Sequence, residues 1–146
     1  MAGVLLSTIR DALATRIDGV TGVRAFGRMP GNIPTSSEAN TAVIVMPDPD
    51  QYVSYWEAFK GGLAEVRFRL LIICQLADFP AAQKRVDELM SAGTGSTMSL
   101  LDAVQADRTL GGTVADAHVG EGQYTGEQEG WLAAHMTVRC VMRREA

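Results

Sequence analysis

The sequence predicts an α+β fold, with a mainly antiparallel sheet of about five strands packed with an N-terminal helix and one or two central helices. Its 146 residues are enough for a single domain, so we treat residues 1–146 as one unit. Helical periodicity marks the N-terminus and the middle of the chain, and strict alternation marks two long segments. Helices and antiparallel strands that are segregated along a chain favour an α+β sandwich over a doubly wound sheet.

The first predicted element is an amphipathic helix over residues 4–17. Its apolar residues recur at spacings of three and four, which places them on one helix face: Leu6, Ile9, Leu13 and Ile17. A short strand over 23–26 follows, and then a loop over 27–40 that is rich in proline and glycine. The β-branched run over 41–46 predicts the next strand.

The strongest strand signal covers residues 63–76. One set of alternating positions is apolar throughout and includes Cys74, whereas the other set carries Glu65, Arg67 and Arg69. Such alternation is typical of an antiparallel strand that is covered on one side.

The central helices are predicted at residues 81–90 and 98–106. Pro80 suits a first helical position, with Asp78 ahead of it as a cap, and Leu101 and Val104 would lie on one face of the second helix. Strands over 113–124 and 131–143 close the domain. The glycines and glutamates between these strands predict a loose acidic hairpin.

Composition excludes several classes of function. The net charge of −4 gives no general attraction to nucleic acid or anionic lipid. Two cysteines are too few for a disulfide framework, and both fall on apolar strand faces, so we expect buried free thiols. The sequence has no apolar run that could cross a membrane and no secretory signal, so we expect a protein made in a reducing cytoplasm.

No motif for catalysis, cofactor binding or metal binding appears. The chain has no phosphate-binding loop, no nucleophile elbow and no paired metal ligands, and Asp48 and Asp50 lack the rest of a calcium loop. We therefore predict no catalytic, cofactor-binding or metal-binding residues. His118 and His135 are the only histidines, and we interpret His135 as a solvated or interface side chain.

Aromatic residues concentrate in one stretch, which is either a core strand or short helix, or a partly exposed interface. The candidates for a protein interface are Tyr52, Tyr55, Trp56, Phe59, Trp131, Arg139 and Arg143. The basic residues do not cluster along the sequence. Two groups of arginines remain: Arg139, Arg143 and Arg144, and Arg67 with Arg69. Each group is either a set of solvated charges, a set of charges at the rim of a protein interface, or a weak contact with phosphate.

The layout of the whole chain resembles the tail terminator proteins of long-tailed, siphovirus-type bacteriophages, the group that includes the phage lambda terminator. The local match is the run from Asp107 to Val114, where Asp-x-Thr-Leu-x-Gly-x-Val joins a short helix to a strand, followed by Gly122-Gln123-Tyr124. The arginine-bearing strand over 65–75 and the closing strand over 132–142 complete the pattern. Neck and head–tail connector proteins have a similar layout.

The resemblance implies a structural virion protein and no catalysis. Such proteins form a hexameric ring on the last ring of major tail-tube subunits, end tube polymerisation, and present a surface to the head–tail connector at the tail–neck junction. DNA would only pass through the lumen, and no cofactor or membrane is expected. The alternatives are a neck protein, or a small enzyme or ligand-binding domain with His118 or His135 beside a carboxylate in a deep apolar pocket.

Overall fold

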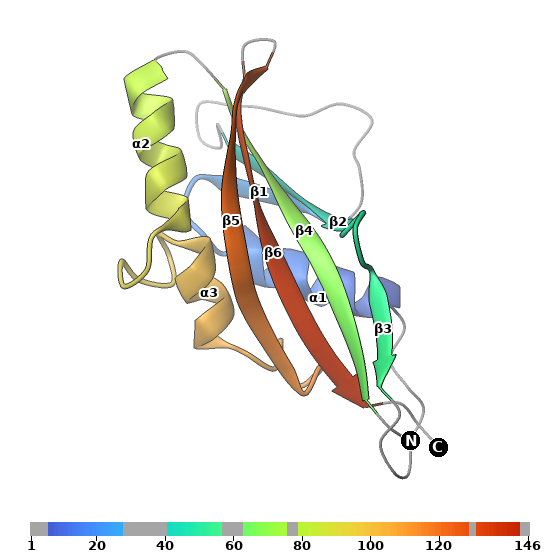
Figure 1. Cartoon of the computed structure of the whole chain (residues 1–146). Coiled ribbons are helices and arrows are strands. Elements are labelled where there is room, and N and C mark those ends of the chain that lie inside the picture. Colours follow the sequence, from blue (N-terminus) through green and yellow to red (C-terminus); the bar gives the residue numbers. More distant parts are fainter. Residues whose placement is uncertain (1–5, 28–40, 57–62, 76–78, 129–130, 144–146) are drawn as a thin grey trace.

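The computed structural model describes residues 6–27, 41–56, 63–75, 79–128 and 131–143, and it confirms the α+β fold class (Figure 1). The described elements, in chain order, are α1 (Leu6–Asp18), β1 (Val23–Phe26), β2 (Thr41–Pro47), β3 (Val53–Trp56), β4 (Leu63–Gln75), α2 (Phe79–Met90), α3 (Leu100–Ala106), β5 (Asp116–Gln128) and β6 (Trp131–Arg143). The additional strand is β3, in the aromatic stretch for which the sequence left strand and helix open. The loop expected over 27–40 falls outside the described residues except for Gly27.

The described strands form one sheet in the order β1-β2-β4-β6-β5, and β3 pairs with β4 beyond the end of β2. β1 and β2 are parallel, and the other described pairs are antiparallel. β4 and β6 form the central ladder, which runs without a register shift from Leu63 opposite Arg143 to Gln75 opposite Trp131. This long pairing fixes which side chains share a face.

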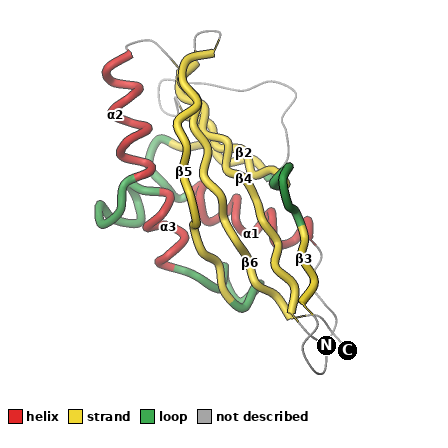
Figure 2. Tube along the Cα trace, viewed as in Figure 1, coloured by secondary structure: helices red, strands yellow, loops and turns green. Residues whose placement is uncertain are grey.

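The described helices cover one face of the sheet and leave the other face open (Figures 1 and 2). α1 contacts β1 and β2, α2 contacts β4 and β6, and α3 contacts β5. The core lies between these helices and the even-numbered positions of β4 and β6. Its largest fully buried side chain is Phe68, whose ring meets the ring of Tyr52 edge to face with centroids 5.7 Å apart. None of the described helices has the length and apolarity needed to cross a membrane.

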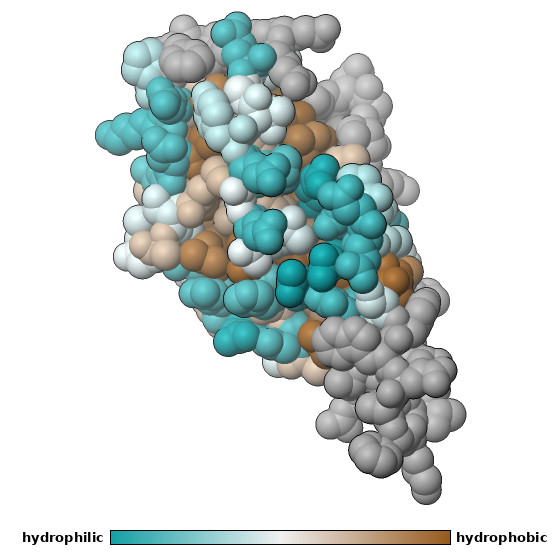
Figure 3. Space-filling model, in the orientation of Figure 1, coloured by the Kyte–Doolittle hydropathy of each residue, from teal (hydrophilic) through white to brown (hydrophobic). Residues whose placement is uncertain are grey.

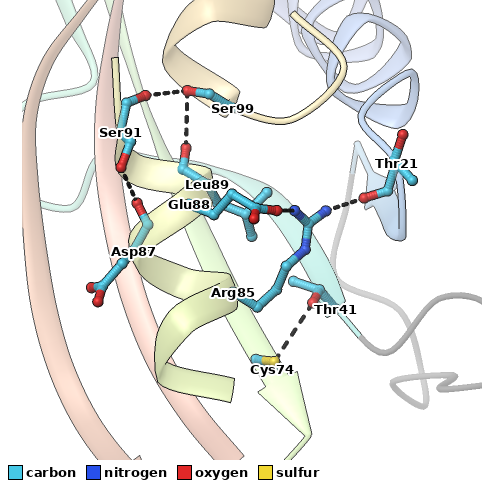
Figure 4. Close-up of polar contacts among 9 residues, drawn as sticks. All are labelled: Thr21, Thr41, Cys74, Arg85, Asp87, Glu88, Leu89, Ser91 and Ser99. Carbon is cyan, nitrogen blue, oxygen red and sulfur yellow. Dashed lines mark hydrogen bonds and ion pairs between the residues drawn. The ribbon is translucent and has the colours of Figure 1, made fainter. Parts of the chain in front are cut away.

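One buried serine joins the two central helices (Figure 4). Ser99 is 0% exposed, and its hydroxyl lies against the carbonyls of Leu89 and Ser91 at the end of α2. The same hydroxyl accepts a hydrogen bond from the backbone N–H of Asp102 and so caps the start of α3. A single side chain therefore satisfies backbone groups at the end of one helix and the start of the next.

Polar contacts also hold the surrounding loops. Arg85 of α2 bonds to Glu88 and to the carbonyl of Thr21, before β1 (Figure 4). The Asp102 carboxylate accepts hydrogen bonds from the backbone N–H groups of Gly93, Thr94 and Gly95 at 2.8–3.0 Å. These bonds stabilise its charged form and lower its pKa.

The segment that carries the family-like run is a tight turn. The Asp107 carboxylate accepts a hydrogen bond from the N–H of Gly111, and Gly111 and Gly112 have φ values of 71° and 89°. Leu110, which directly precedes the two glycines, has a φ of 50°, is 5% exposed and belongs to the core. The Asp and Gly positions of the run are therefore explained by turn geometry, because glycine adopts positive φ without steric cost.

Two sequence expectations need correction. α2 begins at Phe79 and α3 at Leu100, not at residues 81 and 98. On α3 the buried residues are Leu100, Ala103 and Val104, and Leu101 is partly buried and also packs against the core. The capping role expected of Asp78 lies outside the described residues.

The acidic region expected as a loose hairpin is mostly strand. β5 begins at Asp116 and continues to Gln128, so Gly120, Gly122 and Gly126 are strand residues. Register shifts between Val119 and Glu121 and between Tyr124 and Gly126 insert an extra residue at two points, which breaks the two-residue periodicity. Gly122 also faces the core so closely that a Cβ there would lie 2.5 Å from the Met90 side chain.

Candidate functional site

The open face of the sheet carries a concentration of charged side chains. The alternation of β4 and β6 points their odd-numbered residues away from the helices, which places Glu65, Arg67 and Arg69 beside His135 and Arg139. Figure 3 shows this face, with hydrophilic side chains gathered over the middle of the sheet. Sequence alternation correctly predicted that these residues of each strand share a face.

The charged side chains surround a shallow hollow of about 120 Å³, which we call the charged hollow. Its lining comes from β4, β5, β6 and the segment after β2: Asp48, Asp50, Arg67, Arg69, Gly120, Glu121, Gln123, His135, Thr137 and Arg139. The lining is polar rather than apolar, so it is not the deep apolar pocket expected of a small enzyme or ligand-binding domain. Its volume is enough for several water molecules or one small ionic group.

One end of the hollow has more positive than negative charge. Arg67 lies directly opposite Arg139 in the β4–β6 ladder, and Glu65 lies between them, with its Oε1 atom 3.5 Å from the Nε atom of each arginine. We call these three residues the guanidinium end, which has a net charge of +1. Like charges directly opposite one another destabilise a sheet, so Glu65 offsets the repulsion between the two arginines.

The other end has the opposite balance. Arg69 is paired with both Asp48 and Asp50, with N–O distances of 3.6 Å. We call these three residues the carboxylate end; their own net charge is −1, and Glu121 of β5 is a further carboxylate in the lining of the hollow. Asp48 is buried and accepts a hydrogen bond from the N–H of Asp50, whereas the Asp50 side chain is 88% exposed. Asp50 is therefore the carboxylate that is free to reach outward.

The arginines of the hollow are only loosely paired. The Nε atoms of Arg67, Arg69 and Arg139 are buried and have no hydrogen-bond partner among the described residues. Their ion-pair distances of 3.5–3.6 Å are longer than the 2.7–3.2 Å of a normal N–H···O bond. The hollow therefore retains donor capacity that its own carboxylates do not use.

His135 lies beside the carboxylate end, in surroundings that favour the neutral imidazole. Burial and the positive charge of Arg69 lower the pKa of the imidazole, and the negative charge of Asp48 partly offsets them. The expectation of an interface or solvated histidine remains a prediction. His118 is exposed, opposite Arg139.

Of the predicted interface residues, the structure describes the side chains of Tyr52, Trp131 and Arg139, and these have different surroundings. Tyr52 is partly buried and packs against the core, as the core interpretation of the aromatic stretch requires. The backbones of Tyr55 and Trp56 pair with Ala64 and Leu63, while Phe59 and the side chain of Arg143 lie outside the described part of the chain. Trp131 is partly exposed at the end of the β4–β6 ladder.

Among the predicted interface residues whose side chains are described, only Arg139 lines the charged hollow. The expectation that the basic residues do not cluster is wrong for Arg67, Arg69 and Arg139. The ladder brings them together although Arg67 and Arg139 are far apart in the sequence. The sequence did contain a signal for this cluster, because arginines occupy outward-facing positions of two long predicted strands.

Sequence reasoning also missed Tyr124. It is the one large apolar side chain classed as exposed within the described ranges, at 51%, and it lies on β5 at the edge of the sheet. The sequence placed it at the end of the strand predicted over 113–124, and nothing in the pattern indicated that its side chain would be exposed.

The described residues contain no group of three metal-ligating side chains that could hold an ion. Asp48 and Asp50 pair with Arg69 instead. Cys74 and Cys140 are both buried free thiols, as expected. Cys74 lies opposite Leu132, eight residues along β6 from Cys140, so the thiols are roughly 26 Å apart and form no disulfide.

In comparisons with known proteins, no family model matches the chain, and no curated protein matches it.

Proposed function

We propose that this chain is a structural virion protein that forms a hexameric ring at the end of a phage tail tube. The ring would stop the growth of the tube and join it to the head connector at the tail–neck junction. The proposal starts from the resemblance to tail terminator proteins. It does not rest on any catalytic group.

The structural observation that supports ring formation is an open sheet with two unlike edges. In the described sheet β5 forms one edge, with 13 residues that pair only with β6, and the four-residue β1 forms the other. Contacts between unlike surfaces repeat head to tail, and they close into a ring when the rotation between neighbours is suitable. The edges therefore offer the kind of contact that a ring needs.

The edge strand β5 has features that prevent uncontrolled strand pairing. Its two register shifts distort the free edge, and Glu121 and Glu127 place charge along the strand. Tyr124 provides an exposed aromatic side chain on the same strand, and such side chains often dominate binding energy. We expect the ring contact to use these side chains rather than a continued sheet.

The net charge of −4 is compatible with a conduit for DNA. A negative lumen would repel the phosphate backbone and would allow DNA to slide without being retained. The proposed partners are thus further copies of the chain, the major tail-tube protein and the head–tail connector.

The test is to add the purified chain to tail tubes that are still growing from the major tail-tube protein. We expect negative-stain images to show rings at tube ends, tube growth to stop, and native mass spectrometry to detect hexamers. Tyr124→Ala should weaken ring formation at least tenfold, and Thr125→Ala, its exposed neighbour, should not. A strict monomer that leaves tube growth unchanged would contradict the proposal.

A further inference from the structure

We propose that the open sheet face is a contact surface for a second copy of this chain, related to the first by a two-fold rotation. In this contact Asp50 of each copy pairs with the guanidinium end of the other. The proposal is independent of the ring, because a ring uses head-to-tail contacts between unlike edges, whereas this contact joins two identical faces.

The first argument is the unequal charge of the two ends of the hollow. Glu65 is shared by Arg67 and Arg139, so the guanidinium end lacks one carboxylate. Arg69 is shared by Asp48 and Asp50, so the carboxylate end has one carboxylate in excess. The carboxylate end of one copy can therefore supply the negative charge that the guanidinium end of another copy lacks.

The second argument is that both ends lie on the same face. A two-fold rotation about an axis perpendicular to the line that joins the two ends brings each guanidinium end against a carboxylate end, so the match forms twice. Facing sheets pack about 10 Å apart, which extended arginine and aspartate side chains can bridge. A contact made this way is self-complementary and closed at two copies.

The third argument is the exposure of the groups that would meet. The Asp50 side chain is 88% exposed and that of Arg139 is 42% exposed, so both are accessible from solvent. Because the Nε atoms of Arg67 and Arg139 are buried, an incoming carboxylate would approach the exposed part of Arg139. The contact of Arg139 with Glu65 within the chain is a loose 3.5 Å, so a second carboxylate would add a closer partner.

The test is a charge exchange followed by sedimentation velocity at low salt. Asp50→Arg and Arg139→Glu each place like charges together in both halves of a homodimer, so each variant alone should associate at least tenfold more weakly than the original chain. An equimolar mixture of the two should regain association, because the mixed pair has opposite charges at both contacts. The double variant, which exchanges the charges within one chain, should also dimerise.

Two controls are matched in charge change. Lys84→Glu and Asp87→Arg alter exposed residues of α2, on the helical side of the molecule, and should leave association unchanged. Circular dichroism checks that Arg139→Glu is folded, because the new carboxylate lies opposite Arg67 in the ladder but also close to the buried Glu65. Asp50→Arg changes an exposed side chain outside the strands and removes one of the two carboxylates that pair with Arg69.

The proposal is overturned if the original chain stays monomeric at low salt and millimolar concentration, or if the folded single variants fail to associate when mixed. Equal weakening by the α2 controls would also overturn it, since association would then follow net charge alone. A chain that dimerises but does not cap tubes would contradict only the proposed function. Capping without dimers would contradict only this inference.

Discussion

Glu65 is the residue whose loss should reveal how strongly the charged hollow depends on its own ion pairs. Its side chain is 8% exposed and lies 3.5 Å from Nε of both Arg67 and Arg139, whose side chains are 24% and 42% exposed. Replacement by glutamine keeps the volume but removes the charge between two facing guanidinium groups. The change should therefore destabilise the fold without creating a cavity.

The expected magnitude lies between those of exposed and buried ion pairs. Removal of one partner from a buried pair costs about 3–5 kcal/mol, whereas exposed pairs contribute about 0.2–1 kcal/mol each. Glu65 is buried but its partners are partly exposed, so we expect Glu65→Gln to lower the free energy of unfolding by about 2 kcal/mol. For a domain of this size that corresponds to a decrease in Tm of about 4–8 °C.

The assay is urea unfolding followed by circular dichroism, with Tm as a second readout. Arg139→Gln removes the repulsion with Arg67, so the double variant should be more stable than the sum of the single changes predicts, by about 1 kcal/mol. Glu127→Gln, at an exposed position of β5, is the control and should change stability by less than about 0.5 kcal/mol. If Glu65→Gln matches this control, or if the double variant is strictly additive, the interpretation of Glu65 as the shared counter-charge is wrong.

Three further predictions concern other parts of the structure. Ser99→Ala removes the cap of α3 and the buried bond to the end of α2, and should cost about 2 kcal/mol in urea unfolding, while Ser96→Ala at an exposed position should cost almost nothing. Arg69→Met should raise the pKa of His135 in NMR titrations, because it removes a nearby positive charge. In the original chain the pKa of His135 is lower in the folded than in the unfolded state, so the unfolded state binds the proton first as pH decreases. The contribution of His135 to the stability of the fold therefore falls below about pH 6.5. An unchanged titration midpoint of His135 in the variant would contradict this account. Burial raises the pKa of Cys140 to about 12, so thiol reagents at pH 8 should modify it only after denaturation, and rapid labelling of the native protein would refute its burial.

The sequence was sufficient for the elements whose periodicity is undisturbed. β4 and β6 alternate over 13 residues each, and α1 repeats its apolar residues at helical spacing, so their faces could be assigned. β5 could not be assigned in full, because the extra residues at Gly120 and Thr125 shift its periodicity twice. The end of the second central helix was predicted at the observed residue, but its start was predicted two residues too early.

The charged hollow could not be predicted, because it depends on strand register. The alternation predicts that Arg67 and Arg139 face away from the core, but it does not predict that they are opposite each other. Asp48 and Asp50 come from a segment after β2 whose path no periodic pattern describes. The sequence could therefore suggest Arg139 as an individual interface residue. The residues that lie around it could be identified only from the structure.

The register of the central ladder also bears on how the chain folds during synthesis. The pairs from Gln75–Trp131 to Leu63–Arg143 join segments that are 56 to 80 residues apart in sequence. β4 therefore leaves the ribosome long before β6, its main partner, has been synthesised. During that time the apolar face of β4 can contact only β2, β3 and the nascent helices. Contacts at such separation form slowly, since the intervening chain loses entropy when the loop closes. Until β6 is made, β4 presents an unpaired strand edge, so this interval is when the polypeptide is most open to aggregation or to chaperone capture.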